Sequence, residues 1–200
     1  MQARDRRSVL ASAGALVAGG VVVASGGPAE AASDGQARDS FRVVDRRGRQ
    51  RFLASSTKPP VIHSGRTYPA EQRQGPEGTY LIFNDGDGNE KGGIVAASTT
   101  SSISLDYANA QAITIAALWQ GTRGAAGMRI HGMPDPSLPI EQVPRTPDRI
   151  QLLHTTHEGT FLALNDSQGR PRIRLAIDGD DNPSIEVLNA QGQVVSRLPS

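Results

Sequence analysis

Three polar side chains crowd one strand end in this sequence, and two glycines follow them. Asn84, Asp85 and Glu90 come directly after the apolar residues 80–83, and Gly92 and Gly93 come next. Carboxylate and amide oxygens can bind a polar ligand or move protons. A glycine pair lets a ligand or another backbone approach closely. The pattern therefore marks a candidate site, although a β-bulge with purely structural carboxylates would read the same way.

A second polar pair is expected beside the first. Asp106 and Tyr107 end a stretch in which apolar and polar residues alternate, and a neighbouring strand would place them close to Glu90. The ligand-binding candidates are therefore Asn84, Asp85, Glu90, Asp106 and Tyr107. No catalytic residue is assigned, because the sequence has neither a nucleophile elbow nor a phosphate-binding glycine loop.

Two acidic turns match the first positions of a calcium-binding loop. Residues 85–89 and 178–182 both read D-x-D-x-N, which offers oxygen ligands at alternate positions. Glu90 and Pro183 stand where such a loop requires glycine. Asp, Asn and Gly are also the ordinary residues of tight turns. We therefore expect turns without a metal and no cofactor.

The elements that must position these residues read as hairpins. An apolar stretch is followed by D-x-x-G at residues 45–48, 85–88 and 166–169, and by N-x-x-G at 189–192. The first side chain can accept a backbone hydrogen bond, and the fourth residue can adopt positive φ. This spacing suits a type I turn closed by a bulge.

The fold class predicted for residues 41–198 is all-β, an antiparallel hairpin or meander sheet, open or barrel-like, with eight to eleven strands. The C-terminal part should be a meander of four strands, near 160–165, 171–177, 184–188 and 193–198. Five prolines within 134–148 predict an ordered excursion there. One helical turn is expected near residues 148–153.

The first thirty residues read as an export signal. Arg6 and Arg7 precede a weakly apolar stretch at residues 9–24, and a small-residue cleavage site ends at Ala31. This resembles a twin-arginine signal peptide, so residues 1–31 should form a cleaved signal helix recognised by the twin-arginine translocase. Sixteen residues are too few for a stable membrane span. We expect a disordered linker at 32–40 and a secreted or envelope-associated protein.

The amino-acid composition limits the classes of molecule that this protein could bind. The 21 Lys and Arg residues balance 20 Asp and Glu residues, which argues against a nucleic-acid binder. The chain has no cysteine, so disulfides and thiolate chemistry are excluded. Only 4% of the residues are aromatic, which predicts a thin core. Because residues 194–198 would form an apolar edge strand, we expect a homo-oligomer.

Part of the sequence is similar to a known family. Residues 81–85 read L-I-F-N-D, followed by Glu90, by Gly92 and Gly93, and by S-L-D-Y at 104–107. These residues resemble a widespread bacterial family that carries L-I-F-Y-N-D-x-G-x-E-x-G-G, over most of residues 41–198. This chain lacks the tyrosine before Asn84 and has a shorter segment at 134–153, where relatives look helical. The family has no assigned activity, so it implies no catalytic residue.

Together these patterns favour a non-enzymatic envelope or extracellular module that binds a partner or a surface glycan, or a structural unit. The alternative is a secreted hydrolase that uses the clustered carboxylates Asp85, Glu90 and Asp106. Convergence of these side chains in a concave pocket would separate a site from a set of turn tips.

Overall fold

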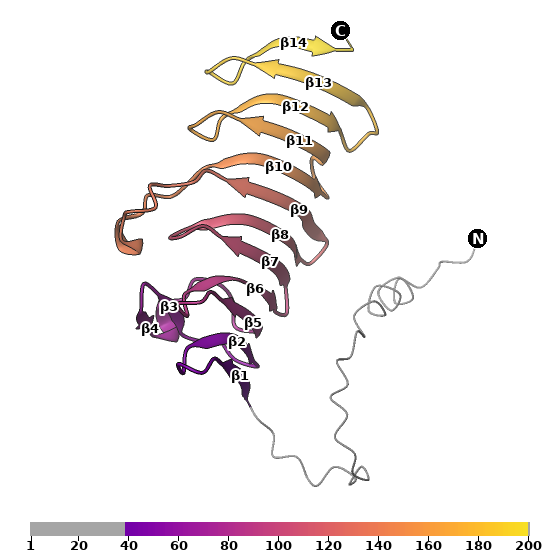
Figure 1. Ribbon diagram of the computed structural model, residues 1–200. Helices are drawn as coiled ribbons and strands as arrows, with labels where there is room; N and C mark the ends of the chain where they lie inside the picture. The colour runs from indigo at the N-terminus through magenta and orange to yellow at the C-terminus, as the bar shows by residue number, and fades with distance from the viewer. Residues whose placement is uncertain (1–38, 200) are drawn as a thin grey trace, which may run out of the picture. The chain divides into compact units, whose positions relative to one another are not determined.

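A computed structural model describes residues 39–199, which form an all-β fold. Twelve strands make one antiparallel sheet, and their order in the sheet follows their order in the chain (Figure 1). A second, two-stranded sheet pairs β3 (Val61–His63) with β4 (Arg66–Tyr68). The strands of the large sheet are β1 (Ser40–Val44), β2 (Gln50–Ser55), β5 (Thr79–Asn84), β6 (Glu90–Ala96), β7 (Thr100–Asp106), β8 (Gln111–Gln120), β9 (Arg123–His131), β10 (Asp148–Thr155), β11 (Gly159–Asn165), β12 (Pro171–Ile177), β13 (Pro183–Leu188) and β14 (Val194–Leu198).

The expected hairpin turns all form. In the first, Oδ1 of Asp45 accepts hydrogen bonds from the backbone N–H groups of Arg47 (2.8 Å) and Arg49 (3.1 Å). Gly48 has φ of +77°, and its N–H donates to the carbonyl of Asp45. The turns at 85–88, 166–169 and 189–192 repeat this arrangement. The aspartate or asparagine therefore satisfies backbone donors, and the glycine supplies the left-handed conformation.

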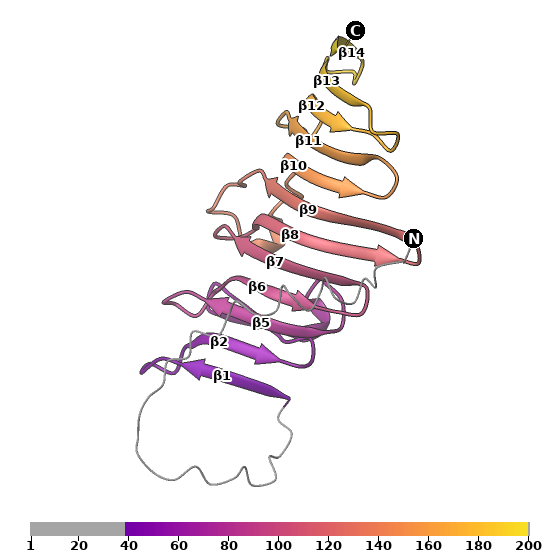
Figure 2. The same ribbon diagram turned by 90° about the vertical axis from the view of Figure 1, so that its right-hand side faces the viewer.

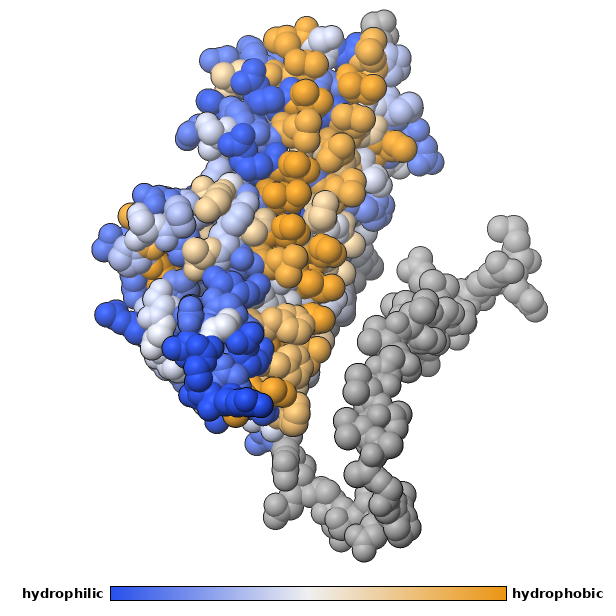
Figure 3. Space-filling model, in the orientation of Figure 1, coloured by the Kyte–Doolittle hydropathy of each residue, from blue (hydrophilic) through white to orange (hydrophobic). Residues whose placement is uncertain are grey.

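One face of the sheet carries two continuous rows of apolar side chains, which we call the apolar face. Because every strand pair is antiparallel and the register shifts fall at the strand ends, residues of twelve strands align into rows. Figure 3 shows the apolar band that results. The first row is Phe41, Ala54, Leu81, Ile94, Ile103, Ile115, Met128, Leu152, Leu162, Leu175, Ile185 and Leu198. The second is Val43, Phe52, Phe83, Gly92, Leu105, Ile113, Ile130, Ile150, Leu164, Ile173, Val187 and Ser196.

The opposite face, which we call the mixed face, combines small, polar and charged residues with the few buried apolar ones. Tyr80 and Ile82 are buried on β5, and Leu153 and Phe161 are buried farther along the sheet. Toward the C-terminus this face becomes charged, as in the register-paired row Arg174, Glu186 and Arg197. Here the strands form a single layer (Figure 2).

Two long excursions leave the sheet. Residues 56–78 connect β2 to β5 and contain β3, β4 and the 3-10 turn η1 (Ala70–Gln72). Residues 132–147 connect β9 to β10 and contain the 3-10 turn η2 (Ile140–Gln142). Asn109, which is buried, donates from Nδ2 to the carbonyls of Asp135 and Leu138, both at 2.9 Å. The second excursion is thereby fixed to the β7–β8 turn.

The structure corrects two details of the sequence prediction and decides a third. Within residues 39–199 the large sheet has twelve strands rather than eight to eleven, since β9 and β10 were not expected, and the small sheet of β3 and β4 is additional. Residues 148–153 belong to β10 and not to a helical turn, because Ile150 and Leu152 pair with strands on both sides. Of the two predicted forms, open or barrel-like, the open one is found within residues 39–199, since β1 and β14 are the edges of the sheet.

The expected export signal at 1–31, with Arg6 and Arg7, lies outside the described residues, as does most of the linker predicted at 32–40. Residues 39 and 40 are described, and β1 begins at Ser40. Among the described residues, none of the helical segments has the length and apolar character needed to cross a membrane.

Candidate functional site

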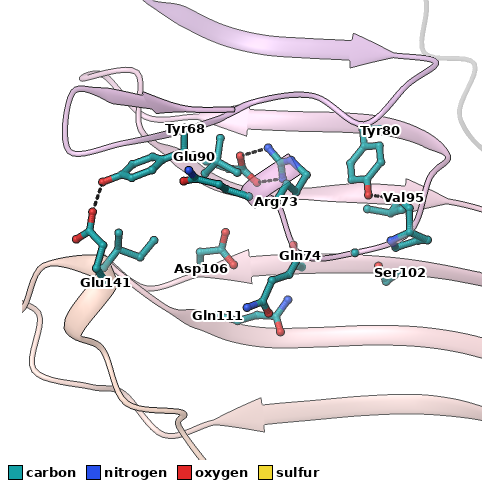
Figure 4. A pocket seen from close by; sticks show the side chains of 16 residues that line it. Tyr68, Arg73, Gln74, Tyr80, Glu90, Val95, Ser102, Asp106, Gln111 and Glu141 are labelled. Carbon is teal, nitrogen blue, oxygen red and sulfur yellow. Dashed lines mark hydrogen bonds and ion pairs between the residues drawn. The ribbon is translucent and has the colours of Figure 1, made fainter. Parts of the chain in front are cut away.

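A cavity of about 590 Å³ lies between the mixed face and the two excursions. Its floor comes from β6, β7 and β8, its roof from residues 72–76, and one wall from η2 (Figure 4). Two of the carboxylates singled out in the sequence, Glu90 and Asp106, line this cavity. The structure therefore brings these two together, although they are distant in the chain.

Glu90 is held by a buried ion pair. Arg73 follows η1 and donates from both terminal guanidinium nitrogens to the two carboxylate oxygens of Glu90, at 2.8 and 2.6 Å. The side chains are only 8% and 14% exposed. Arg73 also donates to the carbonyls of Pro59 (2.7 Å) and Pro60 (2.9 Å). Glu90 is thus neutralised and oriented, and it anchors the first excursion to the sheet.

Asp106 is the carboxylate that remains available. It lies at the end of β7, accepts no side-chain hydrogen bond from the described residues, and faces the cavity below the Arg73–Glu90 pair (Figure 4). Burial, reinforced by the negative charge of Glu90, raises the pKa of Asp106 to about 6. A group with this pKa can accept or donate a proton near neutral pH.

The lining around Asp106 combines neutral polar groups with apolar side chains, among them Val61, Val95 and Ile140. Ser102 and Ser104 project from β7, and Gln111 begins β8. Gln74 reaches the same space from the roof (Figure 4). Hydroxyl and amide groups can each donate and accept hydrogen bonds. The cavity therefore offers an acidic acceptor, Asp106, beside hydroxyl and amide groups that suit a polyhydroxylated molecule.

A hydrogen bond between the two excursions closes one side. The Tyr68 hydroxyl, on β4, donates to Oε1 of Glu141 on η2 at 2.6 Å. This contact raises the pKa of Tyr68 and lowers the pKa of Glu141. Tyr80 lies deeper, 1% exposed, with the guanidinium of Arg73 5.5 Å from its ring centre. Tyr68 and Glu141 therefore connect two segments far apart in sequence at the rim of the cavity.

Asn84 and Asp85 hold the turn between β5 and β6 and do not line the cavity. Asn84 donates from Nδ2 to the carbonyl of Gly88 at 2.8 Å. Oδ1 of Asp85 accepts from the backbone N–H groups of Asp87 (2.8 Å) and Asn89 (2.9 Å). Burial opposes ionisation, but these hydrogen bonds prevail and lower the pKa of Asp85. These two residues act in the turn.

Tyr107 points away from Asp106, as expected for successive residues of a strand. Its hydroxyl donates to the carbonyl of His131 at 3.2 Å, and its own carbonyl lies 3.5 Å from Nζ of Lys91. It lines a smaller cavity of about 140 Å³ next to the main one. Tyr107 therefore supports the β9 end of the site and does not contact the main cavity.

Gly92 and Gly93 are required by the close approach of the neighbouring strands in the sheet. A Cβ on Gly93 would lie 2.5 Å from the carbonyl oxygen of Leu81, and one on Gly92 would overlap the carbonyl of Ser104. Gly92 also has φ of +133°. Both glycines are needed because the flanking strands come close here, which was one of the two readings that the sequence allowed.

Sequence reasoning missed Arg73, Gln74 and Gln111 as site residues. Arg73 lies in an excursion rich in proline and glycine, where its type and spacing carry no signal. A charged residue can be recognised as buried only once its partner is known, and Glu90 is distant in the chain.

The acidic turns have internal partners. Oδ1 of Asp178 accepts from the N–H groups of Asp180 (2.9 Å) and Asn182 (3.0 Å), as Asp85 does in its own turn. Within residues 39–199 no three His, Asp or Glu side chains gather as a metal site requires.

Comparison of the chain with protein-family models, with curated proteins and with solved structures finds no match.

Proposed function

We propose that this protein is an exported, non-enzymatic binding module whose cavity holds a neutral saccharide. One observation carries the proposal: Asp106, a carboxylate without a hydrogen-bond donor among the described residues, faces a cavity that offers both hydroxyl and amide groups and apolar side chains, as the two faces of a sugar ring require. Sugar hydroxyls donate well to a carboxylate and exchange hydrogen bonds with amides. A cavity of about 590 Å³ is within the usual size of small-ligand sites.

The charge distribution supports a neutral ligand. Glu90 is compensated by Arg73, so the carboxylates without a cationic partner are Asp106 inside the cavity and Glu141 at its rim. An anionic ligand would meet this carboxylate and Glu141 at the rim. An apolar ligand would leave Asp106 buried without water or a partner, which costs free energy.

Binding is better supported than hydrolysis. A glycosidase uses two carboxyl groups that flank the scissile bond, one as acid and one as base or nucleophile. Of the three carboxylates in the hydrolase alternative, Asp85 is engaged in its turn and Glu90 in the pair with Arg73. Asp106 alone has free oxygen atoms, which suffices to accept hydrogen bonds from a ligand.

The proposal can be tested by calorimetric titration of the full chain with a panel of neutral mono- and disaccharides. At least one sugar should bind, and Asp106→Asn should weaken that binding at least tenfold. The matched control is Asp180→Asn, in the exposed turn between β12 and β13. Equal binding by the Asp106 and control variants, or no binding by the unaltered chain, would contradict the proposal. Release of a cleaved sugar would instead favour the hydrolase.

We also propose export through the twin-arginine translocase, supported by Arg6, Arg7 and the weakly apolar stretch after them. Replacing both arginines by lysine should leave the full-length precursor inside the cell. Fractionation of cells producing the two forms measures this. Normal secretion of the double variant would exclude the twin-arginine route.

A further inference from the structure

The most apolar surface of the sheet is also its least covered one. Among residues 39–199, the side chains that form the core all project from the mixed face. No large side chain in the two rows of the apolar face is buried, and Leu105 and Leu198 are 52% and 62% exposed. A sheet that places its apolar residues on one face normally buries that face against another layer.

The exposed apolar area is larger than a monomer normally carries. Thirteen large side chains of the two rows are between 38% and 62% exposed. They form a patch on the order of 1,000 Å², against about 300–600 Å² for the largest patch of a typical monomer. A stable protein interface buries about 800 Å² on each partner. The patch is therefore large enough for a complete interface.

We propose that a second copy of this chain covers the apolar face, with like faces packed against each other. The face crosses twelve strands, so its length is about 50 Å at the usual strand spacing. Neither row contains a charged residue, so a partner needs an equally long apolar surface without charges. A second copy supplies that surface, and the charged mixed face of each copy stays in water.

Other occupants fit less well. The apolar stretch at residues 9–24 would be about 24 Å long as a helix, which is less than half the length of the face. Pairing of edge strands, such as β14 with another β14, would add backbone hydrogen bonds and leave the apolar face in water. Face-to-face packing is the arrangement that removes this surface from water.

Sedimentation of the full chain at micromolar concentration provides the first test. The unaltered chain should sediment as two or more copies. Ile185→Glu places a charge on the apolar face and should shift the chain to the monomer mass. Ser184→Glu, the neighbouring residue on the mixed face, should leave the assembly intact. A monomeric unaltered chain, or an assembly that survives Ile185→Glu, would overturn the proposal.

Thiol labelling provides a test that does not depend on a disruptive charge. The chain has no cysteine, so a single introduced one reports on its own position. Leu175→Cys and Ile115→Cys lie on the apolar face, and Arg172→Cys lies on the mixed face of β12. Alkylation of the first two should be at least tenfold slower than that of the third. Equal rates would overturn the proposal, as would slow rates in a chain of monomer mass, because another segment would then cover the face.

Discussion

The N-terminal and C-terminal halves of the sheet use the same hairpins but differ in what covers the mixed face. Around β5 to β8 this face carries Gly93, Ser102 and Ser104, and two excursions cross it to enclose a cavity. From β12 to β14 the row that continues from Gly93 and Ser104 is occupied by Arg174, Glu186 and Arg197, and no described segment covers it. The mixed face thus carries small residues where the excursions cover it and charged residues where it is exposed to solvent. The hairpin is the scaffold, and the excursions create the site.

The largest effect is expected where the covering layer is anchored. Arg73→Ala would leave Glu90 as an uncompensated buried charge and leave the carbonyls of Pro59 and Pro60 without a donor. The loss in unfolding free energy should be about 3–5 kcal/mol. Arg174→Ala is the matched control in the uncovered half, where the pair with Glu158 is 31% and 54% exposed. Its effect should be about 1 kcal/mol, from that pair and from packing on Phe161. Chemical denaturation measures both, and equal losses would contradict the comparison.

Two equivalent turns offer a smaller contrast. Gly169 and Gly192 have φ of +78° and +79°, so valine at either position should cost about 1–3 kcal/mol. A Cβ at Gly169 would lie 2.8 Å from Cβ of Pro147 in the second excursion, whereas a Cβ at Gly192 would have no other atom within 4 Å. Gly169→Val should therefore lower the denaturation midpoint more than Gly192→Val. A reversed order would show that the excursion does not press on the turn.

Asp106 should make the covered half sensitive to pH. Its pKa is about 6 in the folded chain and lower in the unfolded chain, so folding binds a proton between about pH 4 and 6. Stability should therefore fall as pH rises through this window. Asp106→Asn should remove that dependence and raise the unfolding free energy at pH 7 by about 1–2 kcal/mol, allowing for solvent screening. Denaturation at pH 4.5 and 7 tests this, with Asp180→Asn as a control that keeps the wild-type slope.

The smallest effect concerns the turn at 178–181, in which aspartate stands where the turns at 45–48, 85–88, 166–169 and 189–192 have glycine. Asp181 follows the same turn pattern begun by Asp178, but its φ is +64°. Asp181→Gly should raise the unfolding free energy by about 0.5–1 kcal/mol, because glycine adopts this conformation without a Cβ clash. A lower denaturation midpoint would show that the Asp181 side chain contributes more than its backbone strain costs.

The features that could be predicted from the sequence are those that depend on residues close together in the chain. Each hairpin turn is specified by a short segment such as 166–169, and alternation assigns Ile173 and Leu175 to one face. The cavity depends instead on contacts across the chain, such as Tyr68 with Glu141 and Arg73 with Glu90, which no local pattern encodes. For the same reason Asn84 and Asp85 resembled site residues, because a polar turn and a polar site have the same composition.

The strand order of the large sheet bears on how the chain reaches its structure. Apart from the crossing from β2 to β5, every strand pairs only with the strands that precede and follow it in the chain. Such pairing keeps loop closure short, so folding can begin at a single hairpin and extend strand by strand. The two ends of the array should then open before its middle. Backbone amides of β14, which is paired on one side only, should exchange with solvent deuterium faster than those of β8 and β9, which lie in the middle of the sheet.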